Sequence, residues 1–129
     1  MASEMAFWDV VNDIRETDDR FRPQAYVFLM VALQQTVQSL PEERLNDPAH
    51  RHLSGRELLD GMARLAREEF GRLAPLVFAE WGVTRSEDVG EMVFQLVENG
   101  QLSARPEDTL DDFRGFDLDR ELVTDPGGS

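Results

Sequence analysis

The feature that most constrains the fold is a stretch without charge in an otherwise highly charged chain. Charged residues make up 30% of the sequence, yet none occurs between Pro23 and Pro41. Within this stretch, residues 25–33 form an apolar run rich in Ala, Leu and Met, which favours a helix over the competing buried strand. A helix that is apolar on every side normally lies at the centre of its domain. We therefore predict a helix that begins at Pro23 and is buried on all sides.

Two further segments show the period of an amphipathic helix. Residues 3–16 place their apolar side chains on one face and their acids on the other. Ser54 and Glu57 form a capping-box pattern, in which each side chain satisfies a backbone donor of the other residue. The helix that they begin should run to residue 70 and end at Gly71. Between these helices, residues 39–53 have the composition of a loop.

The second half of the chain predicts a pair of helices joined by a tight turn. A short helix over residues 75–81 is followed by one that Thr84 or Ser86 caps and that stops at Gly100. The predicted fold is thus mainly α, with about five helices and a helix-turn-helix or winged-helix-like core over residues 54–104. A small two-stranded element after Gly100 is an open alternative.

Residues 1–122 are predicted to form one acidic helical domain, with its acid-rich C-terminal segment across the surface and residues 123–129 frayed. The two tryptophans and the single tyrosine, Trp8, Trp81 and Tyr26, are predicted to lie in the core. Six glycines are predicted to be helix caps or close packing points: Gly55, Gly61, Gly71, Gly82, Gly90 and Gly100.

The net charge restricts the classes of partner. The 129 residues include 26 Asp and Glu against 13 basic residues, all of them arginine, for a formal charge of −13. Nucleic-acid backbones and anionic lipids are bound by clustered cations, so both are disfavoured as partners. No segment has the roughly 20 apolar residues that span a bilayer, and residues 1–5 lack the features of a secretory signal. We expect no membrane association, a cytoplasmic location and a protein partner with a basic surface; a homodimer is also open.

The helix-turn-helix pattern raises transcriptional control as one hypothesis. A recognition helix places its polar face in the major groove of DNA. Here that face carries no base and four acids, Glu87, Asp88, Glu91 and Glu98. Only Arg85 stands near its start to contact phosphate. We prefer a helix-turn-helix shape without a role in nucleic-acid binding.

A metal-dependent or acid–base enzyme is a second hypothesis. His50 and His52 lie near Asp47 in the predicted loop, and acids from elsewhere could complete a set of ligands. Two histidines in a loop fall short of a site by themselves, and a surface loop is the simpler interpretation. The chain has no cysteine for a thiolate ligand or nucleophile. We predict no metal, no cofactor and no catalytic set.

The four acids on one helix face are the leading candidates for binding a partner. Glu87, Glu91 and Glu98 share a stripe, and Asp88 flanks it. Carboxylates on one helix rarely enclose a cation, because oxygen cages draw on several segments. A solvated face is the alternative interpretation. Glu69 lies within an apolar stripe, where it is either a buried carboxylate or, as we prefer, a helix-end side chain that bends out to water.

Several short motifs together resemble a small bacterial family of uncharacterised single-domain proteins. The motifs are HxSGxEL at residues 52–58, FG at 70–71, WG at 81–82, DxGExVFxL at 88–96, ED at 107–108 before DF at 112–113, and AYVF at 25–28. The likeness covers about residues 5–118. It departs from the family at Leu53 and Met92, which stand where the family has β-branched residues. The resemblance implies no known activity, but it singles out His52, Glu57, Trp81, Asp88 and Glu91 as candidate site residues.

From these observations the leading hypothesis is a non-catalytic protein–protein interaction module. Its candidate binding residues are Glu87, Asp88, Glu91, Glu98, Trp81, His52 and Glu57.

Overall fold

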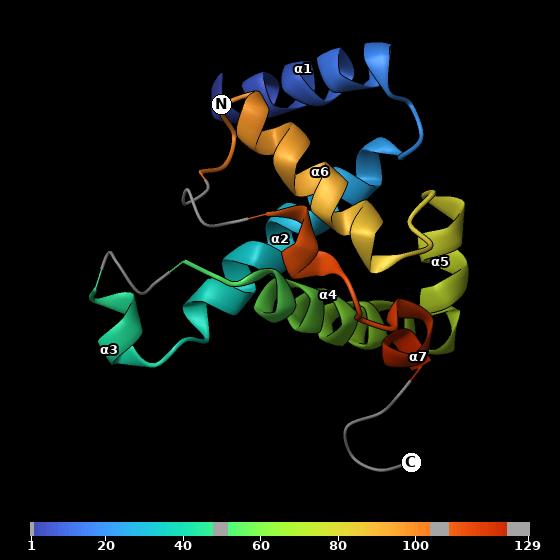
Figure 1. Cartoon of the computed structure of the whole chain (residues 1–129). Helices are drawn as coiled ribbons and strands as arrows, with labels where there is room; N and C mark the ends of the chain where they lie inside the picture. The colour runs from blue at the N-terminus through green and yellow to red at the C-terminus, as the bar shows by residue number, and fades with distance from the viewer. Residues whose placement is uncertain (1, 48–51, 104–108, 124–129) are drawn as a thin grey trace.

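A computed structural model describes residues 2–47, 52–103 and 109–123 of the chain, with side chains from residue 7 onward. It shows a mainly helical protein, as predicted (Figure 1). The helices are α1 (Ala2–Thr17), α2 (Pro23–Gln38), α3 (Glu42–Leu45), α4 (Gly55–Phe70), α5 (Ala74–Glu80), α6 (Ser86–Glu98) and α7 (Leu118–Val123), with 3₁₀ turns η1 (Gly71–Leu73) and η2 (Leu110–Phe113).

The five predicted helices correspond to α1, α2, α4, α5 and α6, each within about two residues of its predicted ends. The short helix α3 lies inside the segment that was predicted to be a loop. In the part of the chain that the structure describes there is no strand, so the two-stranded element weighed after Gly100 is not found there. None of the described helices is long and apolar enough to cross a membrane.

The centre of the molecule is the packing of α2 against α4 (Figure 1). The two helices approach closely at Gly61 of α4, where an added Cβ would lie 2.0 Å from Oγ1 of Thr36 on α2. One face of α2 is buried here, with Ala25, Tyr26, Phe28, Leu29 and Ala32. The capping box of α4 is formed as predicted: Glu57 N donates to Ser54 Oγ, and Ser54 N donates to Glu57 Oε1.

The prediction that α2 is buried on every side is wrong. Val31 is 41% exposed and Val27 is only half-buried, although both belong to the apolar run. Two helices, α1 and α4, flank α2 without closing over its outer face, and this leaves an uncharged face of α2 open. Hydropathy alone cannot distinguish a helix covered on all sides from one whose apolar outer face stays accessible.

The C-terminal segment was predicted to lie across the surface, and this is also wrong. Phe113, Phe116, Leu118 and Leu122 are all buried. The turn η2 packs on α6 and α4, and α7 packs on α4 and α5 (Figure 1). Gly90 allows this packing, because a Cβ there would lie 2.9 Å from the ring of Phe113. Among the described acids of this segment Glu121 is half-buried and the others are exposed, while Phe113, Phe116, Leu118 and Leu122 complete the core.

The turn between α5 and α6 also contacts the connection between α1 and α2. Gly82 has a φ of +86°, and a Cβ there would lie 2.1 Å from the carbonyl oxygen of Arg20. Only glycine combines this backbone conformation with so close an approach. Arg22 N donates to the carbonyl oxygen of Trp81 at 3.0 Å, which closes the contact. Two turns that are distant in sequence are thereby held together.

Candidate functional site

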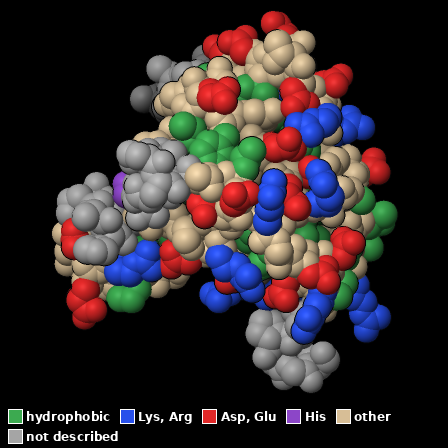
Figure 2. Space-filling model, in the orientation of Figure 1, with side chains coloured by type: hydrophobic (Ala, Val, Ile, Leu, Met, Phe, Trp, Pro, Cys, Tyr) green, Lys and Arg blue, Asp and Glu red, His purple; other side chains and the backbone are tan. Residues whose placement is uncertain are grey.

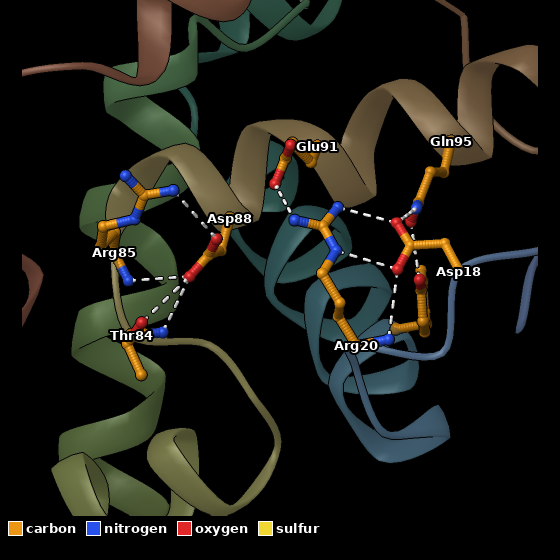
Figure 3. Close-up of polar contacts among 8 residues, drawn as sticks. Asp18, Arg20, Thr84, Arg85, Asp88, Glu91 and Gln95 are labelled. Carbon is orange, nitrogen blue, oxygen red and sulfur yellow. Dashed lines mark hydrogen bonds and ion pairs between the residues drawn. The ribbon is translucent and has the colours of Figure 1, made fainter.

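The acids on α6, predicted as the leading candidates for binding a partner, are not uniformly open to solvent. Asp88 is only 5% exposed, and its Oδ2 accepts hydrogen bonds from the backbone N–H groups of Thr84 and Arg85, both at 3.0 Å (Figure 3). These donors belong to the N-cap residue Arg85 and to the residue before it, just ahead of the first turn of α6. Asp88 therefore caps α6 and is not available to a partner.

Glu91 and Gln95 bind the connection between α1 and α2. Arg20 donates to Glu91 Oε2 at 2.9 Å and to both carboxylate oxygens of Asp18 (Figure 3). Gln95 donates to Asp18 Oδ2 at 2.9 Å and accepts from the hydroxyl of Tyr26 at 2.6 Å. The hydrogen bond from Arg20 lowers the pKa of Asp18. Burial, reinforced by the Asp18 carboxylate, raises the pKa of Tyr26 to about 12.

The remaining acids of this face differ in exposure. Glu87 is half-buried and accepts a hydrogen bond from Ser86 Oγ at 3.3 Å, whereas Glu98 is exposed. Figure 2 shows acidic side chains alternating with arginines over the face that carries α6, without one continuous acidic area. Of the four predicted binding acids, Glu98 alone is fully exposed, so a binding stripe on α6 loses most of its support.

His52 and Glu57 have partners of their own, at the start of α4. Arg44 of α3 donates to Glu57 Oε2 at 2.6 Å and to the carbonyl oxygen of His52 at 3.2 Å. The hydrogen bond from Arg44 lowers the pKa of Glu57 and raises that of Arg44. His52 also lines a mainly apolar cavity of about 440 Å³, and Leu58 and Phe113 are among its other lining residues.

The predicted site residues therefore do not converge. Glu57 interacts with Arg44, Asp88 with the backbone just before α6, and Glu91 with Arg20. His50 of the enzyme hypothesis lies outside the described residues. Among the residues that are described, no group of three or more His, Asp or Glu side chains has the arrangement of a metal site.

The structure instead brings Trp8 and Trp81 to one apolar groove. The groove consists of two adjoining hollows, of about 380 and 880 Å³, which share Trp8, Val27 and Val31. The smaller hollow continues to Phe28, Leu65, Phe70 and Trp81, and the larger continues to Phe7, Met30, Leu33 and Val37. We call these lining residues the α1–α2 groove.

Three aromatic rings, those of Phe28, Phe70 and Trp81, form the floor at one end of the α1–α2 groove, and the buried ring of Phe78 supports them from below. The rings of Phe28, Phe70, Phe78 and Trp81 pack with centroid distances of 5.4–5.7 Å in stacked and edge-on pairs. Contacts of this kind make a firm floor, because each ring is fixed by its neighbours. Trp8, from α1, lies at the boundary between the two hollows and is 43% exposed. The prediction of a core position was thus right for Tyr26, wrong for Trp8 and only partly right for half-buried Trp81.

The polar lining of the α1–α2 groove is sparse. It consists of Gln24, Gln34, Gln38 and Glu69. Glu69 is exposed, as we preferred, and it is the single ionisable side chain among the described lining residues. Because no arginine lines the groove, its charge is negative and small.

Sequence reasoning missed this groove, although one signal for it was present. The charge-free stretch between Pro23 and Pro41 contains several glutamines in addition to its apolar run. Gln24, Gln34, Gln35 and Gln38 are all exposed. An exposed helix face that carries glutamine and valine but no charge, in a chain with 30% charged residues, is typical of the centre of an interface.

Such a groove can bury apolar side chains of a ligand, and it offers no pair of groups for acid–base or nucleophilic chemistry among its described residues. The family resemblance drawn from the short motifs stays a prediction. Comparison with protein-family models, with curated proteins and with solved structures found no match.

Proposed function

We propose that this protein is a non-catalytic protein–protein interaction module that binds its partner in the α1–α2 groove. The observation that carries the proposal is the exposed pair Trp8 and Val31 beside the aromatic floor. Tryptophans in partly formed pockets are the side chains that contribute most to protein–protein binding. Burial of such a surface is favourable at about 25 cal/mol for each Å² of apolar area removed from water.

The net charge supports a partner with a basic surface. At −13, the protein attracts cationic partners and repels anionic ones over distances of about 10 Å at moderate ionic strength. This attraction speeds the encounter, while the apolar groove supplies the lasting contact. Binding sites built on Glu57, Asp88 or Glu91 have less support, because these side chains already have partners within the chain.

Photo-crosslinking at two matched surface positions tests this function. A photoreactive amino acid replaces Val31 in the groove in one protein and Leu76 of α5 in the other. Leu76 is 63% exposed and lines neither hollow, so it is the matched control. Irradiation in the cells that make the protein should give a discrete protein adduct from position 31 and none from position 76. Equal labelling from both positions, or no protein adduct from position 31, would contradict the proposal.

Salt provides an independent readout of the basic partner. When the irradiation is repeated in a lysate of these cells, adduct formation from position 31 should decrease as the salt concentration is raised, because salt screens the attraction to a protein of net charge −13. An adduct that forms equally well in high salt would keep the groove as the docking surface but remove the basic partner.

A further inference from the structure

We infer that the occupant of the α1–α2 groove is a single amphipathic α-helix of a partner, which lies along α2 with a Lys or Arg beside Glu69. This inference rests on the proposed function and specifies the partner's chemistry. Three features of the groove carry it: the state of its backbone groups, its length along α2, and the position of its one ionisable group.

The backbone around the groove selects a helix over an extended peptide. All lining residues except Trp81 belong to α1, α2 and α4, whose backbone groups bond mainly within their own helices. The backbone of Trp81 is also occupied, because its N–H donates to Val77 and its carbonyl accepts from Arg22. An extended peptide would bury its N–H and C=O groups without partners, at a cost for each one. A helix satisfies these groups internally and offers its apolar side chains.

The length of the groove sets the length of the occupant. The lining residues of α2 run from Gln24 to Gln38. At a rise of 1.5 Å per residue this span is about 21 Å, which matches a helix of about four turns. Side chains of such a helix recur on one face at i, i+3 or i+4, and i+7. One would lie over the floor at Phe28, the next beside Val31, and a third between Phe7 and Leu33.

The position of Glu69 predicts that the basic residue of the occupant lies at one end of the groove. Glu69 lies in the smaller hollow with the aromatic floor, and no other ionisable side chain lines either hollow within the described part of the chain. Among the described lining residues Glu69 is thus the one partner for a cation on the occupant, and this places the basic end of the helix over the smaller hollow. A second copy of this chain fits less well, because it adds another charge of −13 and its own α2 carries no cation for Glu69.

Selection from a display library of random peptides of about 18 residues tests the occupant, because this length covers four helical turns and both ends. The intact protein is the bait, and Val31→Glu is the groove variant. Leu76→Glu adds the same charge to an exposed apolar position outside the groove and serves as the control. We expect enriched peptides with apolar residues at helical spacing and a Lys or Arg toward one end. Their affinity should fall at least about tenfold in Val31→Glu, because the new carboxylate would be buried unpaired.

Binding can be followed by intrinsic fluorescence, since both tryptophans of the chain line the groove. Glu69→Gln should weaken a Lys-bearing peptide about two- to fivefold, as for an exposed ion pair, and leave its Lys→Gln counterpart unchanged. Unfolding midpoints show that each variant is folded.

Several outcomes would overturn the inference. The selection would contradict it if no peptides were enriched, or if the enriched peptides had an alternating or proline-rich pattern. It would also be contradicted if the peptides bound Val31→Glu as well as the wild type, or if the crosslinked adduct were a second copy of this chain. If position 31 crosslinks to a foreign protein while selection yields no helical peptides, the helical occupant fails and the interaction module stands. If neither experiment finds a ligand, both fail.

Discussion

Trp8 on α1 and Trp81 at the end of α5 line the same hollow, although they come from opposite halves of the chain. They differ in environment, because Trp8 is 43% exposed while Trp81 packs on three phenylalanine rings. We expect Trp8→Phe to shift the emission to shorter wavelength and to reduce quenching by acrylamide. Trp81→Phe should have the opposite effect on both. Similar quenching of the two variants would mean that the hollow is closed in solution.

Asp88 is expected to matter for stability and not for binding. Asp88→Ala removes the acceptor for the backbone N–H groups of Thr84 and Arg85 at the start of α6, so it should lower the free energy of unfolding by about 1–2 kcal/mol. Glu98→Ala, at the exposed end of the same helix, should change it by less than about 0.5 kcal/mol. Urea unfolding of the two variants measures the difference. Equal stabilities would show that the cap does not hold α6.

Gly61 is expected to tolerate no side chain. A Cβ at this position would lie 2.0 Å from Thr36 Oγ1, so Gly61→Ala must displace the Thr36 side chain or push α2 and α4 apart. Overpacking of this kind lowers the free energy of unfolding by about 1–3 kcal/mol. Thr36→Ala removes the atom closest to the added Cβ. In a Thr36→Ala background, Gly61→Ala should therefore lower the free energy of unfolding by less than it does in the wild type. A double-mutant cycle by urea unfolding checks this, and strictly additive effects would argue against the close approach.

The alkaline titration of Tyr26 should not overlap with that of any other side chain. The chain has no lysine and no cysteine, so the single tyrosine is the one side chain with an ordinary pKa between about 9 and 12. Burial raises its pKa from 10.0 to about 12. Between these values the folded protein holds a proton that the unfolded chain has lost, so stability falls as pH rises through this window.

Tyrosinate absorbance of the native protein measures this pKa directly. In urea unfolding, the wild type should lose more stability than Tyr26→Phe between about pH 10 and 12. A native titration near the ordinary value of 10.0 would contradict the buried hydroxyl that bonds to Gln95.

Glu57 links stability to acid pH in the opposite direction. Its pKa is lowered, chiefly by the hydrogen bond from Arg44, so the unfolded chain takes up this proton more readily than the folded one. The stabilisation is present above the ordinary pKa of 4.5 and is lost as pH falls below it. Glu57→Gln keeps an acceptor for the N–H of Ser54 but loses the ion pair with Arg44, so it should be less stable by up to about 1 kcal/mol at neutral pH. Urea unfolding near pH 3 should show a smaller difference, and an equal or larger one would contradict the assignment.

The secondary structure was predictable because its signals are local. The capping box of Ser54 and Glu57, the period of apolar residues and the glycines at 71, 82 and 100 act within a few residues of the chain. The glycines at 55, 61 and 90 were predicted to be either helix caps or close packing points, and only the structure shows that they are packing points and against which residues. The predictions that were wrong concern contacts between segments that are distant in the sequence. The C-terminal segment was placed on the surface because its acids outnumber its apolar residues, whereas Phe113 fits against Gly90.

The sequence by itself determined the helices, the charge and the uncharged face of α2, since these follow from the order of the side chains. Only the tertiary structure decided which of these faces stay open. Asp88 and Glu91 looked free but are held by Thr84, Arg85 and Arg20, while Val31 looked buried and is exposed. The physical reason is that helix period fixes which side chains share a face, but burial depends on which other segments cover that face.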